Sequence, residues 1–267
     1  MNFYKTFEIP PKLCVAIVGA GGKTTLMYRL AAEMVPEAEI ADGVVLIAST
    51  TKIFRPEPDE ADVVILSENL QEAQKQIKKM AQGGLRIVLG TGSHNDPRYD
   101  TSKLDGIPPQ WAGSLLEMEE VSWLLIEADG SQRKPVKAPG PREPVWPNPT
   151  HWTIGVLGLS ALGHKNYRDR VFRPECVSKV TNVPQGTILE LSTYLSLLTN
   201  SDGIFRDAPK ESRLIGFLNQ SDTCDQVVDH NTVGYIIDRE VNPGRLESVF
   251  LGSLIDTKIQ RVWAREG

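Results

Sequence analysis

Residues 15–26 combine an apolar run with glycines, a lysine and two threonines. The stretch reads Val15-Ala-Ile-Val-Gly-Ala-Gly-Gly-Lys-Thr-Thr-Leu26. An apolar strand that enters a glycine-rich loop and continues into a helix is typical of a phosphate-binding loop. Glycine lets backbone N–H groups approach an anion, and the helix directs its positive end to the same place. The stretch therefore predicts a nucleotide-binding α/β protein.

The residues expected to bind the phosphates are Gly19, Ala20, Gly21, Gly22, Lys23, Thr24 and Thr25. Lys23 would reach the terminal phosphates, and the Thr24 hydroxyl would be a magnesium ligand. The loop has the form Gly-x-x-Gly-Lys-Thr, which is shorter than the common P-loop pattern and resembles the loop of Mur-ligase-type enzymes. A dinucleotide fingerprint fits less well, because Thr24 stands where its third glycine would be.

Further apolar segments predict the rest of a sheet. They lie at residues 44–48, 62–66, 85–89, 123–126, 152–157, 213–218 and 246–251. Helical periodicity predicts helices over about 24–35, 70–80 and 188–198, whereas the polar segment 91–109 is expected to be a long surface loop. This alternation predicts a P-loop NTPase-like α/β fold, with a mostly parallel sheet flanked by helices on both faces. We expect a single domain over residues 1–267, with a nucleotide-binding first half of about 1–130 and an elaborated second half of about 131–267.

Two carboxylates, Glu127 and Asp129, follow the apolar segment 123–126. Acids at the end of a strand, in a chain with a phosphate-binding loop, are expected to form the magnesium side of a nucleotide site, because magnesium prefers oxygen ligands. We expect Thr24 and Asp129 to hold the metal, and Glu127 or Asp129 to orient or deprotonate the attacking group. The candidate catalytic residues are Lys23, Glu127 and Asp129.

Two polar segments are candidates for substrate contacts. Thr50, Thr51 and Lys52 follow the strand predicted at 44–48, and ligands gather at the carboxyl ends of strands in open α/β sheets. Lys134 and Lys137 lie in the proline-rich segment 131–149, which is expected to be a stiff loop that could clamp an anion. The alternatives are a polar turn at 49–52 and a solvated connector at 131–149.

The segment Asn219-Gln-Ser-Asp222 follows the strand predicted at 213–218 and approximates the Asn-Lys-x-Asp element of GTP-binding proteins, with Gln220 in place of the lysine. If Asn219 and Asp222 read a base, guanine is favoured over adenine. The alternative is an ordinary turn after a strand. The expected cofactors are therefore GTP or ATP with magnesium.

Composition excludes several other classes. The net charge of −5 gives no electrostatic footprint for nucleic acid or an anionic membrane. Three widely separated cysteines argue against a disulfide scaffold, and four scattered histidines do not form a zinc-binding pattern. The polar start lacks the apolar core of an export signal, and no apolar run is long enough to cross a bilayer. We expect a cytoplasmic protein without membrane or nucleic-acid partners.

Several motifs along the chain together resemble the YqeC family. They are Val18-Gly-Ala-Gly-Gly-Lys-Thr-Thr25, Thr50-Thr-Lys52, Glu127-Ala-Asp-Gly-Ser131, Lys134-Pro-Val-Lys-Ala-Pro139, Glu143-Pro-Val-Trp-Pro147, Gly158-Leu-Ser-Ala-Leu-Gly163 and Leu218-Asn-Gln-Ser-Asp222. The family is described as accessory proteins of selenium-dependent molybdenum hydroxylases. The resemblance implies a role in the maturation of such an enzyme, with a molybdenum hydroxylase or its cofactor-maturation proteins as partners.

The leading functional hypothesis is a magnesium-dependent NTP hydrolase or phosphotransferase that serves this maturation. A nucleotide-gated, chaperone-like binding protein with little intrinsic turnover is the first alternative. A ligase that uses ATP to activate a carboxylate is a weaker one, suggested by the short Mur-like loop alone.

Overall fold

The structure is a computed structural model that describes residues 2–81, 83–97, 101–239 and 241–266. Its main sheet contains β1 (Cys14–Gly19), β2 (Val44–Ser49), β4 (Val63–Leu66), β5 (Arg86–Gly90), β8 (Val121–Glu127), β10 (Trp152–Gly158), β12 (Arg213–Asn219), β13 (Leu246–Ser253) and β14 (Lys258–Ala264). The helices are α1 (Phe3–Thr6), α2 (Lys23–Ile40), α3 (Leu70–Met80), α4 (Trp111–Leu116), α5 (Pro174–Thr181), α6 (Leu191–Thr199) and α7 (His230–Arg239). Short 3₁₀ helices, η1 (Leu159–Ala161) and η2 (Ser221–Thr223), follow β10 and β12.

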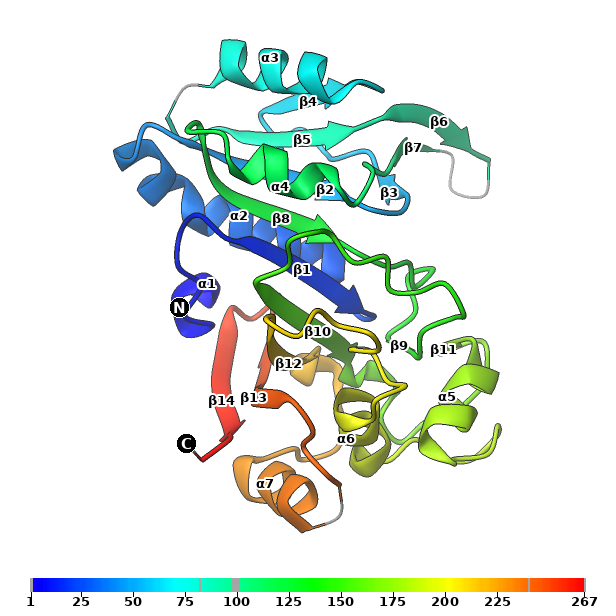
Figure 1. Cartoon of the computed structure of the whole chain (residues 1–267). Coiled ribbons are helices and arrows are strands. Elements are labelled where there is room, and N and C mark those ends of the chain that lie inside the picture. The colour runs from blue at the N-terminus through cyan, green and yellow to red at the C-terminus, as the bar shows by residue number, and fades with distance from the viewer. Residues whose placement is uncertain (1, 82, 98–100, 240, 267) are drawn as a thin grey trace.

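Within the described residues the main sheet has nine strands, in the order β14-β13-β12-β10-β1-β8-β2-β5-β4 (Figure 1). Neighbouring strands are parallel, except that β14 runs antiparallel to β13. The predicted α/β class with a mostly parallel sheet is confirmed. Strands from both halves of the chain belong to this one sheet, so the glycine-rich loop after β1 has neighbours from early and late in the sequence.

Helices cover both faces of the sheet because its inner strands are apolar on both alternations. In β2, Val45 and Ile47 belong to the apolar cluster that contains the buried residues of α2. Leu46 lies on the other face, in the cluster that contains Ala73 and Ile77 of α3. Helices α5, α6 and α7 pack against the strands from the second half of the chain (Figure 1).

The segment 91–109 differs from the predicted surface loop. It forms an antiparallel hairpin of β6 (Gly92–Asp96) and β7 (Thr101–Asp105), and β7 also pairs with β3 (Ile53–Phe54). Residues 98–100 of this segment lie outside the described residues. The sequence did not indicate these strands because their residues are mostly polar and their faces are only partly buried.

The carboxyl ends of the parallel strands meet at one edge of the sheet, where the small sheet β3-β7-β6 and the pair β9 (Val136–Lys137) and β11 (Val171–Phe172) also lie (Figure 1). The register aligns Ile17 of β1 with Glu127 of β8, and Gly19 with Val156 of β10. The glycine-rich loop, the two acids and the end of β10 are therefore neighbours. In the part of the chain that the structure describes, no helix is long and apolar enough to cross a bilayer.

Candidate functional site

The glycine-rich loop makes a tight turn between β1 and α2. Gly21 and Gly22 have φ angles of 80° and 120°, and Gly22 is the residue that caps α2. A Cβ atom on Gly21 would lie 2.4 Å from the Gly158 nitrogen, so both the backbone conformation and the close approach of β10 require glycine there. The sequence thus folds this loop against the end of a neighbouring strand.

The first three N–H groups of the loop have acceptors inside the protein. Gly19 donates to Asp129 Oδ2 at 3.1 Å, Ala20 to the Val156 carbonyl at 2.8 Å, and Gly21 to the Lys134 carbonyl at 3.1 Å. In the structure these three amides are therefore engaged within the protein, and phosphate binding by Gly19, Ala20 and Gly21 stays a prediction.

The amides that can receive an anion lie one step further along the chain. Leu26 donates the first intrahelical hydrogen bond of α2, to the Gly22 carbonyl at 2.8 Å. The N–H groups of residues 22–25 therefore point out of the helix end, as the first amides of an α-helix do. Gly22, Lys23, Thr24 and Thr25 also line a cleft, so these amides face a space that a ligand could enter.

The Lys23 side chain folds back onto the two predicted acids. Its ammonium lies 3.4 Å from Glu127 Oε1 and 3.4 Å from Asp129 Oδ1, and it donates to Ser131 Oγ at 3.3 Å. Lys23 is only 3% exposed. Burial alone would lower the pKa of the Lys23 ammonium, but the two carboxylates outweigh burial and raise that pKa. The lysine is therefore a protonated cation at neutral pH.

Glu127 and Asp129 differ in depth and in partners. Glu127 lines the cleft, and its Oε2 accepts a hydrogen bond of 2.6 Å from the Thr24 hydroxyl. Asp129 is 0% exposed, and its Oδ1 has no hydrogen-bond donor among the described residues, although Lys23 is near. The sequence favoured Asp129 as the metal partner of Thr24, whereas the contact in the structure is between Thr24 and Glu127.

Lys137 is buried beneath the site. Its ammonium lies 2.8 Å from Asp129 Oδ2 and 2.7 Å from Glu143 Oε2, and it also donates to the Gly130 carbonyl at 2.8 Å. Lys137 is 0% exposed, and its three acceptors hold it against Asp129 and Glu143. In the structure Lys137 therefore positions Asp129, and its expected substrate contact stays a prediction.

Glu143 joins this network from the proline-rich segment. It accepts from Arg173 Nη1 at 2.7 Å and from the Gly140 amide at 3.2 Å, as well as from Lys137. Burial would raise the pKa of the Glu143 carboxyl, but Lys137, the Gly140 amide and Arg173 together lower it. The sequence indicated no role for Glu143, because a single acid in a proline-rich segment carries no sign of the buried lysine that it pairs with.

The cleft in front of the loop has a volume of about 750 Å³. Of the predicted substrate residues, Thr51, Lys52 and Lys134 line it, and the Lys134 ammonium donates to the Asp169 carbonyl at 2.9 Å. Thr50 is not among the described lining residues, and its hydroxyl donates to the Val145 carbonyl at 2.6 Å. Thr50 thus joins the end of β2 to the proline-rich segment, and its expected substrate contact stays a prediction.

Comparison with known proteins identifies the family of the chain. A family model described as YqeC protein matches residues 15–175. This range is more than half of the chain and contains the glycine-rich loop, both acids, Lys137 and Arg173.

The chain belongs to the YqeC family.

A curated relative, the "Uncharacterized protein YqeC" of Escherichia coli (strain K12), is 28% identical to this YqeC chain over 214 residues. The aligned part covers 80% of this chain and 78% of the relative. No solved structure matches the chain.

Asn219 and Asp222 lie beyond the range that the YqeC family model matches. Asn219 is buried, its amide donates to the Gly21 carbonyl at 2.8 Å, and its Oδ1 accepts from the Leu254 amide at 3.2 Å. Asn219 therefore braces the glycine-rich loop. Asp222 is exposed in η2, and the intervening Gln220 lines the cleft. Base recognition by Asn219 and Asp222 stays a prediction.

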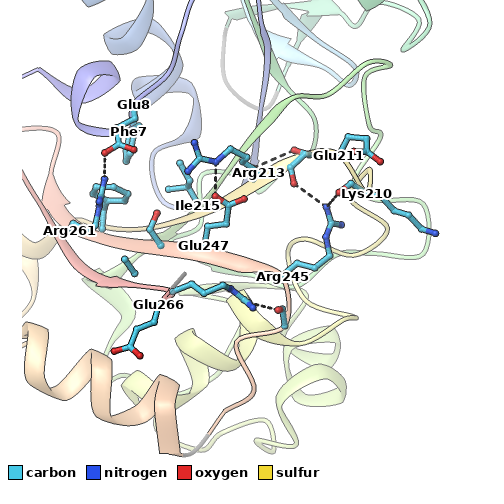
Figure 2. A pocket seen from close by; sticks show the side chains of 16 residues that line it. Phe7, Glu8, Lys210, Glu211, Arg213, Ile215, Arg245, Glu247, Arg261 and Glu266 are labelled. Atoms are coloured by element: carbon cyan, nitrogen blue, oxygen red, sulfur yellow. Dashed lines mark hydrogen bonds and ion pairs between the residues drawn. The ribbon is translucent and has the colours of Figure 1, made fainter.

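A second cleft, of about 600 Å³, lies at the opposite edge of the sheet, where β12 and β13 begin (Figure 2). Its arginines have partners within the protein. Arg213 pairs with Glu247 and Arg261 with Glu8, each at 2.6 Å, while Arg245 donates to main-chain carbonyls between residues 208 and 212. These contacts connect β12 with β13, β14 with Glu8, and the segment before β13 with the segment before β12, which indicates a structural role for the residues of this cleft.

Proposed function

We propose that this YqeC-family chain binds GTP or ATP with magnesium and hydrolyses or transfers the terminal phosphoryl group. One observation carries the proposal: the open amides at the start of α2 adjoin Lys23, whose ammonium lies 3.4 Å from carboxylates of both Glu127 and Asp129. An anion-binding helix end beside a lysine and strand-end acids provides the groups that phosphoryl transfer uses.

The residues present fit a magnesium ion at the edge of the cleft. Thr24 and Glu127 would hold it, because their oxygens are 2.6 Å apart and both residues line the cleft. Magnesium usually takes few protein ligands and completes its shell with substrate phosphates and water, so two side chains suffice. When bound, it would neutralise charge that develops on the phosphates.

Lys23 has to change partners for this chemistry. In the structure the charge of Lys23 is balanced by Glu127 and Asp129. Phosphate oxygens at the start of α2 would compete for the ammonium, and Asp129 would keep Lys137 and the Gly19 amide as partners after Lys23 leaves. Lys23 would then stabilise the transferring phosphoryl group. Glu127 would hold magnesium through Oε2, which contacts Thr24, and orient the attacking oxygen through Oε1, which Lys23 would release.

The biological setting that we propose rests on the family resemblance. The chain would act as an accessory factor in the maturation of selenium-dependent molybdenum hydroxylases, with the hydroxylase or its cofactor-maturation proteins as partners. Phosphate release measured with and without such a partner tests this part.

The Lys23 contacts also favour a second candidate function, a nucleotide-gated binding protein. Because nucleotide must draw Lys23 away from two carboxylates, binding would rearrange the acids even without turnover. Negligible hydrolysis by the purified protein, together with tight nucleotide binding and stimulation by a partner, would favour this candidate.

The test is a binding titration with ATP and GTP, each with and without magnesium, followed by phosphate release. We expect Lys23→Ala to weaken binding and abolish turnover, and Glu127→Gln to remove the magnesium dependence. Lys79→Ala is the matched control, since Lys79 is exposed on α3. Full nucleotide hydrolysis by Lys23→Ala would overturn the proposed function.

A further inference from the structure

The cleft continues beyond the glycine-rich loop into a basic end. The described residues that line this end include the basic residues Lys52, Arg55, Lys103, Arg133 and Lys134. The acids that line this end are Glu57 and Glu60, while Asp105 lies 3.5 Å from the Lys52 ammonium and Asp96 lies 2.9 Å from the Lys103 ammonium. Basic residues still outnumber these acids, although the whole chain has a net charge of −5. An excess of one charge in a cleft raises the local concentration of ligands of the other sign.

The basic end is built around Phe54 of β3. The Arg133 guanidinium lies 4.4 Å and the Lys103 ammonium 4.5 Å from the centroid of the Phe54 ring. Lys103 is held further by Asp96 Oδ2 at 2.9 Å. Arg55 follows Phe54 directly, its backbone amide donates to the Ser102 carbonyl at 3.0 Å, and its side chain is exposed. Contacts with the Phe54 ring thus hold the side chains of Lys103 and Arg133, and pairing with β7 holds the backbone of Arg55.

The basic end lies away from the predicted base-reading segment. In the sheet, β12 and β2 are on opposite sides of β1, and β12 leads into Asn219 and Gln220. Residues 51–55 follow β2. A nucleotide with its phosphates at the start of α2 and its base toward Gln220 leaves the region of Arg55 and Lys103 open to a second molecule.

A buried hydroxyl of the residues that line the cleft lacks a hydrogen-bond partner in the part of the chain that the structure describes. Tyr28 of α2 lines the cleft and is 5% exposed, yet its hydroxyl has no hydrogen-bond partner among the described residues. Burial first, and then the charges of Glu60 and Glu127, raise the pKa of the Tyr28 phenol, so it stays a donor at neutral pH. An unpaired buried donor is costly, which points to an acceptor supplied by a ligand.

We propose that the basic end is a second subsite, which binds the phosphate group of a small acceptor beside the terminal phosphate of the nucleotide. Arg55 and Arg133 would contact this phosphate, and Tyr28 would donate to the acceptor. The inference rests on the proposed function and narrows it, because it makes the chain a phosphotransferase with a phosphorylated acceptor. An oxygen of the acceptor would attack the terminal phosphorus, the bond from that phosphorus to the bridging oxygen would break, and the nucleoside diphosphate would leave, while Glu127 would take up the proton of the acceptor.

The test uses the full chain saturated with magnesium and a non-hydrolysable triphosphate analogue. The analogue is that of ATP or of GTP, whichever of the two binds more tightly in the titration described above. Inorganic phosphate and glycerol phosphate are titrated in separately by calorimetry, with acetate as a control anion. We expect both phosphates to bind and acetate not to bind. Tighter binding of glycerol phosphate would indicate an ester as the natural ligand, and tighter binding of inorganic phosphate would indicate the free ion.

Arg55→Ala and Arg133→Ala should each weaken phosphate binding at least about tenfold, the effect of losing one charged hydrogen bond. Arg239→Ala is the charge-matched control, because Arg239 is exposed at the end of α7, away from the cleft (Figure 1). Tyr28→Phe gives a second readout, since it removes only the hydroxyl.

The outcomes separate this inference from the proposed function. If the wild-type chain does not bind nucleotide, both fail. If nucleotide binds but neither phosphate binds to the saturated protein, only the second subsite is overturned. The same conclusion follows if Arg55→Ala weakens nucleotide binding as much as it weakens phosphate binding, because the basic end would then belong to the nucleotide site.

Discussion

Replacing Lys137 with methionine tests the buried network that positions Asp129. The change keeps an unbranched side chain of similar length but removes the ammonium that bridges Asp129 and Glu143 at 2.8 and 2.7 Å. Removing one partner of a buried ion pair costs about 3–5 kcal/mol, because the other charge stays buried without compensation.

The structure places the expected cost at the lower end of this range. Asp129 would keep the Gly19 amide at 3.1 Å, and Glu143 would keep Arg173 at 2.7 Å. We therefore expect Lys137→Met to lower the free energy of unfolding by about 3 kcal/mol. With a urea dependence of about 3 kcal/mol per molar, the unfolding midpoint would fall by about 1 M.

The assay is urea unfolding followed by tryptophan fluorescence, with Lys79→Met as the matched control. An exposed lysine such as Lys79 should change stability by no more than about 0.5 kcal/mol. If Lys137→Met lowers the free energy of unfolding by less than about 1 kcal/mol, the loss is no larger than the contribution of a solvent-exposed ion pair, and the buried network is refuted. Nucleotide binding by the folded variant should also weaken, because Asp129 anchors the Gly19 amide.

Three further predictions test other parts of the site. Gly21→Ala should lower the free energy of unfolding by more than about 1 kcal/mol and abolish nucleotide binding. Gly234→Ala is the control and should stabilise the chain, because the added Cβ meets nothing within 4 Å in α7. Equal unfolding midpoints for the two variants would contradict this prediction. Glu143→Gln should lower the free energy of unfolding at neutral pH. Because the pKa of Glu143 is lowered in the folded protein, the difference in this free energy between wild type and variant should shrink as the pH falls below 4.5. A difference in urea unfolding that does not change with pH would exclude the charge effect. Asp222→Ala should remove any preference for GTP in the binding titration, and an unchanged preference would rule out base reading by this residue.

Much of the fold could be predicted because burial on both faces makes a strand apolar throughout. This pattern located β2, β8 and β10 within a residue or two. It failed for β6 and β7, where the strands carry polar side chains and are stabilised by pairing with each other and with β3. Backbone pairing leaves no periodicity in the sequence when neither face is buried.

The site was predictable where residue type and chain position together define the chemistry. The P-loop pattern and the strand-end acids led to Lys23, Glu127 and Asp129, which do lie in contact. Depth was not predictable, since a lysine in a proline-rich segment looks the same whether it is solvated or, like Lys137, 0% exposed. The partner Glu143 was missed for the same reason.

The bracing of the glycine-rich loop has a consequence for how the protein is made. Asn219, which bonds to the Gly21 carbonyl, lies 198 residues later in the chain, and the Ala20 amide depends on β10. At translation rates of about 5–20 residues per second, Asn219 leaves the ribosome's catalytic centre roughly 10–40 s after Gly21. A nascent chain that contains only residues 1–130 would carry the loop's sequence without these supports, so the loop would reach its final conformation only at the last stage of folding.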